Sequence, residues 1–253
     1  MSRPSVAELR PVAQPAGLLD RESGEHWAGR LYMRRLSPYV TTVFARTSVR
    51  PDTLTGLMIL VGLAGAAVLV VPGLAAAVAA ALLIQIYLLL DCSDGELARW
   101  RGTTSPRGVY LDRVGHYLVE AAFLTALGAR AADGADGWLA LGLAAALGAI
   151  LIKAETDLVD VARARYGAAP ASDADASVPS RGLGGLRRAA QVLSAHRLIQ
   201  AVELSLAAVV AAAYDAAAGG VTATRVLVAA CAVIAGVLVV AHLVSILASS
   251  RLR

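Results

Sequence analysis

Three aspartates and a histidine lie close together in the sequence, at spacings that could build a cation site. Asp91 and Asp94 are three residues apart, and Asp112 and His116 are four apart. Each pair shares one face if its segment is helical. About ten residues connect the two segments, which favours antiparallel neighbouring helices. Carboxylates gathered in a poorly hydrated site repel one another, so the pattern predicts a divalent cation with oxygen ligands, which keeps positions open for phosphate oxygens.

Small and basic residues surround these acids. Gly95 and Ala98 continue the face of Asp91 and Asp94, and small residues let a ligand or a neighbouring backbone approach closely. Four arginines lie around the same segment, and guanidinium groups suit phosphate. The alternative is that the arginines only extend from a membrane edge to water. They are Arg99, Arg101, Arg107 and Arg113.

The composition indicates that the helices carrying these groups lie in a membrane. Of 253 residues, 57% are hydrophobic and 17% are charged, whereas a soluble domain is about half apolar and a quarter charged. This excludes an ordinary soluble enzyme and a disordered chain. We expect an all-α integral membrane fold, because six segments approach the roughly 20 apolar residues that a span needs. They are 54–71, 74–97, 109–129, 137–160, 195–214 and 226–248.

The distribution of basic residues predicts the orientation of these segments. The net charge is +4, and the loops on one side would hold only Arg130 and Arg225. Positive charge marks the cytoplasmic side. We therefore expect an integral cytoplasmic (inner) membrane protein with both termini and the acidic cluster on the cytoplasmic side. Nucleic acid is not an expected partner, because the basic residues lie between apolar blocks.

The segments outside the spans have distinct characters. Residues 1–25 form a polar tail without a signal peptide. Residues 26–50 contain an amphipathic stretch, expected as an interfacial helix that breaks near Pro38, with a soluble cap as the alternative. Residues 51–250 then form the six-helix domain, and 166–190 is expected to be a mobile cytoplasmic loop. Cys92 and Cys231 are expected to be small buried residues.

The spacing of the acidic segment resembles the signature of the CDP-alcohol phosphotransferase (CDP-alcohol phosphatidyltransferase) family. That signature reads D-x2-D-G-x2-A-R-x8-G-x3-D-x3-D, and seven positions match in order. Residues 51–55, PDTLT, also resemble the family's Pro-Asn-x-Leu-Thr, with Asp52 in place of asparagine. The matched positions are Asp91, Asp94, Gly95, Ala98, Arg99, Gly108 and Asp112.

The resemblance implies a membrane transferase of phospholipid synthesis. It would move a substituted phosphoryl group, such as phosphatidyl, from a CDP-alcohol to a polar acceptor hydroxyl and release CMP. CDP-diacylglycerol would be the lipid donor, Mg²⁺ or Mn²⁺ the cofactor, and a homodimer the assembly. Asp91, Asp94, Asp112 and His116 would hold metal, generally as a two-metal site. The nucleotide would lie against Asp94, Gly95, Ala98, Arg99, Gly108 and Asp112.

His116 departs from the signature, which has a fourth aspartate at this position. Neutral imidazole can ligate a metal, and its ordinary pKa of about 6.5 suits a general base. Three interpretations stay open: a base or ligand in an active enzyme, a one-metal variant with altered acceptor choice, and a member that has lost activity. Glu120, four residues further on, could orient the ring.

The acceptor side is less defined in the sequence. Lys153, the only lysine, and Arg197 could bind an acceptor phosphate, whereas Lys153 could instead pair with Asp157. Glu203 and His242 are expected to be polar contacts between helices.

Two other functions remain as alternatives. The first is a transferase with a soluble CDP-alcohol or an unusual acceptor. The second is a non-catalytic ion-binding or transport protein. A transporter would need polar groups near the middle of the membrane, and here they cluster at one edge.

Overall fold

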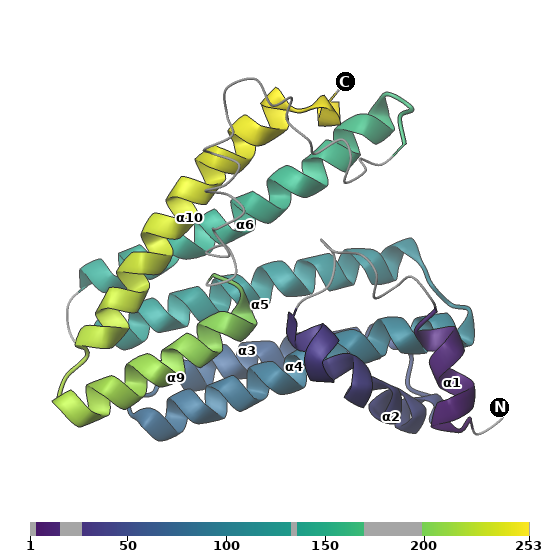
Figure 1. Cartoon of the computed structure of the whole chain (residues 1–253), viewed down its shortest axis with the longest axis horizontal. Coiled ribbons are helices and arrows are strands. Elements are labelled where there is room, and N and C mark those ends of the chain that lie inside the picture. Colours follow the sequence, from purple (N-terminus) through teal and green to yellow (C-terminus); the bar gives the residue numbers. More distant parts are fainter. Residues whose placement is uncertain (1–3, 16–26, 133–135, 170–198, 253) are drawn as a thin grey trace. The chain divides into compact units, whose positions relative to one another are not determined.

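The computed structural model describes residues 4–15, 27–132, 136–169 and 199–252, and in these ranges every regular element is a helix. The elements are α1 (Val6–Ala13), the π-helical turn η1 (Gly29–Met33), α2 (Arg34–Ala45), α3 (Pro51–Val70), α4 (Leu74–Arg101), α5 (Pro106–Ala132), α6 (Asp136–Arg165), α9 (Ala201–Ala218), α10 (Thr222–Ala248) and the 3-10 turn η3 (Ser250–Leu252). In the described ranges, α1 and α2 precede six long helices, and the ribbon follows this order (Figure 1).

The long helices overlap the six segments predicted from the sequence. Among the described residues, five are long and apolar enough to cross a membrane, namely α3, α4, α6, α9 and α10. These helices make the chain a multi-pass membrane protein. The remaining long helix, α5, is not one of the five. It carries Asp112, Glu120 and Arg130 along its length, and charged groups lower its hydropathy.

The helices divide between two compact units, and the first comprises residues 1–65 and 82–119. Here the first part of α3 packs against α4 and α5 without room for side chains at two positions. A β-carbon on Gly62 would lie 2.5 Å from Val119 and 3.0 Å from Tyr87, and one on Gly115 would lie 2.8 Å from Met58. The two glycines therefore let three helices approach closely.

The connection from α4 to α5 is short and fixed by its residue types. Gly102 has a φ of +63°, which suits glycine after a helix end. The Thr103 N–H donates to the Ala98 carbonyl over 2.9 Å, and this bond caps α4. Pro106 then begins α5, where its fixed φ suits the first helical residue. This turn brings the end of α4 beside the start of α5.

The N-terminal elements of the first unit form an arm, defined here as α1, Gln14 and α2, that packs on α4. A capping box of Ser5 and Glu8 begins α1 and satisfies its free N–H groups. The two hydrogen bonds from Ser5 lower the pKa of Glu8. Leu9 and Ala13 of α1 are fully buried.

The prediction of a helix break near Pro38 is wrong, because Pro38 lies inside α2. A proline lacks the N–H that would bond the carbonyl four residues earlier. That carbonyl, on Arg34, instead accepts a 2.8 Å hydrogen bond from the Gln14 side chain. The irregular backbone lies earlier, in the π-helical turn η1. The Gln14 side chain therefore supplies the hydrogen-bond donor that Pro38 lacks.

Side-chain polarity on α2 is reversed relative to a soluble helix. Ser37 and Thr41 are fully buried, whereas Leu36, Tyr39 and Val43 are exposed to fractions of 49%, 59% and 62%. The exposed apolar face is the arrangement expected of a helix that touches lipid.

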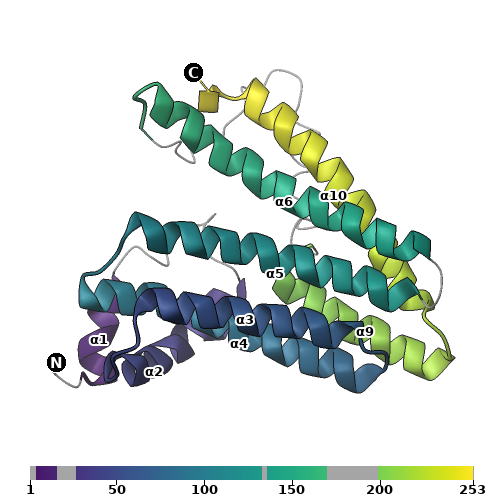
Figure 2. The ribbon, with the colours of Figure 1, turned by 180° about the vertical axis from the view of Figure 1, so that it is seen from behind.

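The second unit comprises residues 66–81 and 120–253. In this unit α10 runs along α6, and both views show the two helices side by side (Figure 2). Gly128 of α5 and Gly142 of α6 meet so closely that a β-carbon on either would lie 2.8 Å from the other's backbone. Such small-residue contacts are typical of membrane helix pairs.

Polar side chains also connect helices of the second unit. Asp215 of α9 accepts hydrogen bonds from Thr224 at the start of α10. His242 Nε2 lies 3.0 Å from Thr156 Oγ1 of α6, so the expected interhelical role of His242 is confirmed. Most of the loop predicted at 166–190 lies outside the described residues.

Candidate active site

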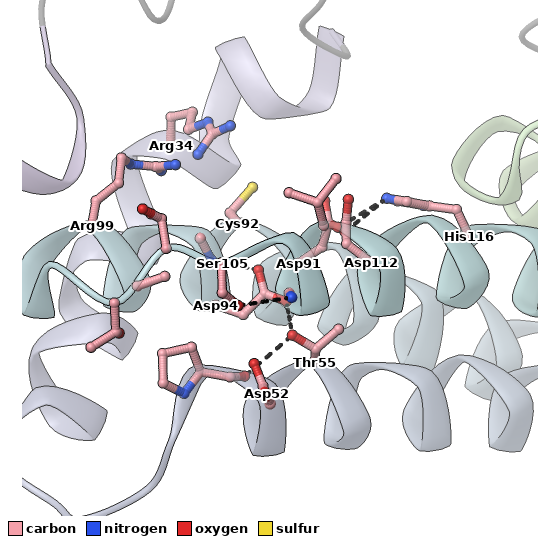
Figure 3. Close-up of a pocket in the computed structure, with 17 residues that line it drawn as sticks. Arg34, Asp52, Thr55, Asp91, Cys92, Asp94, Arg99, Ser105, Asp112 and His116 are labelled. Carbon is pink, nitrogen blue, oxygen red and sulfur yellow. Dashed lines mark hydrogen bonds and ion pairs between the residues drawn. The ribbon is translucent and has the colours of Figure 1, made fainter. Parts of the chain in front are cut away.

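A cavity of about 350 Å³ lies in the first unit, among the start of α3, the end of α4 and the start of α5 (Figure 3). All eight predicted residues of the acidic segment line it. They are Asp91, Asp94, Gly95, Ala98, Arg99, Gly108, Asp112 and His116.

Three of the four predicted metal ligands converge at one end of this cavity. One ligand atom from each of Asp91, Asp112 and His116 lies within 4.8 Å of the others. His116 Nε2 is 3.1 Å from Asp91 Oδ1 and 3.5 Å from Asp112 Oδ1. Two carboxylate oxygens and one imidazole nitrogen fit a divalent cation such as Mn²⁺, and also Mg²⁺ with added oxygen ligands. A divalent metal site is therefore consistent with this cluster, here named the triad.

Asp94, the fourth predicted ligand, faces α3. Its Oδ2 accepts a 2.5 Å hydrogen bond from Thr55 Oγ1, and its Oδ1 accepts one from the Gly95 N–H. The residue is only 7% exposed. A buried carboxylate held by two donors has a fixed orientation, and Thr55 thereby connects the start of α3 to the acidic segment of α4.

The imidazole of His116 is held from its other side by Tyr87. The Tyr87 hydroxyl lies 2.6 Å from His116 Nδ1, and the two rings meet edge to face with centroids 5.9 Å apart. Glu120, which the sequence suggested as the orienting group, lies 3.2 Å from Lys153 Nζ. The residue that contacts the imidazole is thus on α4, one turn before Asp91.

The two signature glycines differ in what occupies the space beside them. The Arg99 guanidinium lies over Gly95, where a β-carbon would be 3.3 Å from its Nη1 atom. At Gly108 the nearest atoms to a β-carbon would be 3.6 Å and 3.9 Å away, on Ser105 and Asp52. Gly95 therefore makes room for a guanidinium, whereas Gly108 leaves open cavity.

The arm contributes to the other end of the cavity, where Arg34 and Arg99 lie away from His116 (Figure 3). Arg99 Nε donates a 2.7 Å hydrogen bond to the Ala13 carbonyl of α1. Arg34 Nη1 lies 3.6 Å from Glu96, whose side chain is fully buried.

Glu96 is the centre of the contacts between the arm and α4. It accepts hydrogen bonds from Gln14 (2.7 Å), Ser37 (2.5 Å) and Thr41 (2.7 Å). A buried carboxylate is tolerated only when paired and hydrogen-bonded in this way. The arm is therefore anchored within the acidic segment itself, between Asp94 and Arg99.

Of the two predicted acceptor residues, only Lys153 lies among the described residues. Lys153 is in the second unit and forms its ion pair with Glu120 there. Arg197 lies outside the described residues.

The residues at or beside the cavity that were not predicted as site residues include Arg34, Thr55, Tyr87 and Glu96. Two had a signal in the sequence: Thr55 ends the PDTLT segment, and Tyr87 precedes Asp91 by one helical turn on the same face. Arg34 and Glu96 gave none, because their contacts join segments about 60 residues apart in the chain.

Comparison with known proteins agrees with this geometry. Residues 48–172 match the CDP-alcohol phosphatidyltransferase family. This segment is a CDP-alcohol phosphatidyltransferase domain. It contains α3, α4, α5 and every cavity residue except Arg34, so the arm precedes the matched part of the phosphatidyltransferase domain.

Individual relatives resemble larger parts of the chain. The bifunctional IPC transferase and DIPP synthase of Thermococcus kodakarensis is 31% identical over 166 residues, which are 65% of this chain and 35% of that protein. The chain thus spans about a third of that relative. The crystal structure of Mycobacterium tuberculosis phosphatidylinositol phosphate synthase with CDP-DAG bound aligns with a TM-score of 0.59 and 19% identity. The alignment covers 85% of this chain and 95% of that one, and it shows a shared fold.

Proposed function

We propose that this protein is a membrane transferase that moves a phosphatidyl group from CDP-diacylglycerol to the hydroxyl of a polar alcohol and releases CMP. The observation that carries the proposal is the set of seven signature residues around one cavity, beside a triad that fits a divalent cation. The family match supports the reaction class. The structure of the relative with CDP-DAG bound supports the choice of donor.

The proposed reaction forms one phosphorus–oxygen bond and breaks another. The acceptor oxygen bonds the phosphorus of the phosphatidyl group, and the bond from that phosphorus to the CMP oxygen breaks, with its electron pair leaving on CMP. Asp91, Asp112 and His116 would hold the metal ion, with Asp94 beside them. Such an ion, when bound, neutralises charge on the diphosphate. Gly108 leaves room for the nucleotide, and Arg99 faces its phosphates.

His116 would take the proton of the acceptor hydroxyl. Its Nε2 atom faces the carboxylates, and only a lone pair on that atom can accept a proton or bind a metal. One lone pair serves one role at a time. If Nε2 is a ligand, the site differs from a four-aspartate site in its second metal position, and a carboxylate of the triad would act as base.

The same features support a proposed placement in the membrane. The exposed Leu36, Tyr39 and Val43 would lie in the headgroup region, and α5 would cross the bilayer as a sixth span. The cavity and both termini would then face the cytoplasm of an inner membrane, where a polar acceptor is available. The active form would be a homodimer.

The acceptor would be a phosphorylated alcohol. This proposal is supported by the name of the structural relative, a phosphatidylinositol phosphate synthase. Lys153 and Arg197 are the proposed contacts for the acceptor phosphate. Glu120 balances the charge of Lys153 over 3.2 Å, so the acceptor phosphate would compete with that carboxylate.

Release of CMP by the purified protein tests the proposal. The assay supplies CDP-diacylglycerol, Mg²⁺ or Mn²⁺, and inositol phosphate, glycerol phosphate or serine. We expect acceptor-dependent CMP release that Asp94→Asn and His116→Ala abolish, and that the exposed-site control Tyr166→Phe retains. No binding of CDP-diacylglycerol would contradict the proposal. A soluble CDP-alcohol as the better donor would replace this function with its closest alternative.

A further inference from the structure

The hydroxyl group of Tyr87 lies where it can control the imidazole that replaces the last signature aspartate. Tyr87 is 2% exposed, and a phenol oxygen can accept a hydrogen bond as well as donate one. That oxygen lies 2.6 Å from His116 Nδ1. The opposite ring nitrogen, Nε2, faces Asp91 and Asp112. One residue therefore fixes which edge of the imidazole points into the triad.

Two helical pairs build this arrangement. Tyr87 and Asp91 are four residues apart on α4, and Asp112 and His116 are four apart on α5. Because each pair shares a helix face, the four side chains meet across the two helices. The Tyr87 ring is itself confined, since a β-carbon on Gly62 would come within 3.0 Å of it. The hydroxyl is consequently held in place by packing as well as by its hydrogen bond.

We propose that Tyr87 is the positioning residue for His116, and that it keeps the Nε2 lone pair directed at the triad. When the Tyr87 oxygen accepts a hydrogen bond from Nδ1–H, the neutral ring carries its lone pair on Nε2. A histidine ligand is commonly fixed in this way by a partner on its second nitrogen. The same tautomer is required whether Nε2 binds the metal or takes a proton.

A positioning residue is needed because position 116 carries a histidine where the signature has an aspartate. An aspartate has two equivalent oxygens and needs no choice of tautomer. An imidazole has two different nitrogens, and rotation of the ring or the wrong tautomer would turn a donor toward the cation site. Tyr87 and His116 thus act as a pair, and a carboxylate at position 116 would not depend on Tyr87.

This dependence allows a double-mutant test that separates positioning from packing. The variants are Tyr87→Phe, His116→Asp and the two combined, with Tyr110→Phe, which is 67% exposed, as the matched control. The first readout is Mn²⁺ binding without substrate, followed by electron paramagnetic resonance. We expect Tyr87→Phe to weaken Mn²⁺ binding by about 10- to 100-fold when residue 116 is histidine. In the His116→Asp protein the same change should alter binding by less than about 3-fold.

The opposite results are equally clear. An equal loss in both backgrounds would show that Tyr87 acts through packing alone. Unchanged Mn²⁺ binding together with an unchanged tautomer of His116 in Tyr87→Phe would overturn the proposal. A second readout does not depend on whether His116→Asp folds: ¹⁵N spectra of labelled histidine should show Nδ1–H at His116, lost in Tyr87→Phe. A ring protonated on Nε2 alone in the unmodified protein would contradict the inference.

The inference rests on the proposed function, yet the two can fail separately. CMP release should fall by about 10- to 100-fold in Tyr87→Phe with little change in the KM for CDP-diacylglycerol, and the decrease should vanish in the His116→Asp background. If no acceptor supports CMP release while the Mn²⁺ cycle behaves as expected, the proposed reaction is wrong and the role of Tyr87 stands.

Discussion

Replacing Glu96 by alanine should detach the arm from α4. The substitution leaves three donors without their carboxylate, those of Gln14, Ser37 and Thr41. Hydrogen bonds to a charged group contribute roughly 1.5–3 kcal/mol each. However, Gln14 still reaches the Arg34 carbonyl at 2.8 Å, and Thr41 still reaches the Ser37 carbonyl at 2.8 Å. Of these three donors, only the Ser37 hydroxyl loses its acceptor outright, and the 3.6 Å ion pair between Arg34 and Glu96 is also lost.

We therefore expect Glu96→Ala to weaken the docking of the arm by about 3–4 kcal/mol. This is more than the loss of one hydrogen bond to a charged group and less than the loss of three, and it lies within the range for breaking a buried charged contact. Since about 1.4 kcal/mol corresponds to a factor of ten, amide hydrogen exchange in α2 should accelerate by about 100- to 1000-fold. Hydrogen–deuterium exchange of the purified protein, followed on peptides from α2, measures this directly.

The glutamine variant sharpens the test. In Glu96→Gln the amide oxygen can still accept from Gln14 and Ser37. The new NH2 group can donate to Thr41, whose own hydroxyl turns to the Ser37 carbonyl. We expect a cost of about 1–2 kcal/mol, from the lost charge alone. Ser93→Ala is the matched control, because Ser93 is equally buried on α4 and, within the described part of the chain, donates its hydrogen bond to the Leu89 carbonyl of its own helix.

Two results would refute this reasoning. The first is unchanged exchange of α2 in Glu96→Ala. The second is a glutamine variant that loosens α2 as much as alanine does, which would mean that the hydrogen-bond geometry has no part in docking.

Two further predictions concern the site and the second unit. Thr55→Val should lower CMP release by about 10-fold, because Asp94 loses a charge-assisted hydrogen bond of about 1.5 kcal/mol. Thr55→Ser keeps the hydroxyl and should retain activity. An equal loss in both variants would contradict this prediction. Gly142→Ala should destabilise the protein by about 1–3 kcal/mol through overpacking, since the added carbon meets the backbone of Gly128 at 2.8 Å. Gly236→Ala, with no atom within 4 Å, should leave thermal unfolding in detergent unchanged, and an equal effect of both variants would contradict the contact.

The sequence predicted the long helices and the clustering of the acidic segment around one cavity, because both are encoded locally. Apolar runs determine where the long helices lie, and i, i+3 and i, i+4 spacings brought Asp91, Asp112 and His116 into one cluster. The predicted break at Pro38 was wrong because the carbonyl it frees is satisfied by Gln14. No local pattern reveals a partner contributed by another helix.

The partners of single polar groups were harder to predict for the same reason. The sequence offered Glu120 as a neighbour of His116, and the ring instead contacts Tyr87. It offered Asp157 or an acceptor for Lys153, which lies beside Glu120. In each case the expected partner lies four residues away on the same helix, whereas the observed partner lies on a different helix that only the packing brings close.

The position of Glu96 also sets an order of events during synthesis. Gln14 precedes Glu96 by 82 residues, so the arm leaves the ribosome well before its anchor exists. At about 5–20 residues per second, the interval is roughly 4 to 16 s. Ser37 and Thr41 precede Glu96 by 59 and 55 residues, so for roughly 3 to 12 s they must be hydrated or lie among headgroups. Docking of the arm can therefore occur only after α3 and nearly all of α4 have been synthesised. The end of the cavity that the arm contributes is thus completed late in translation.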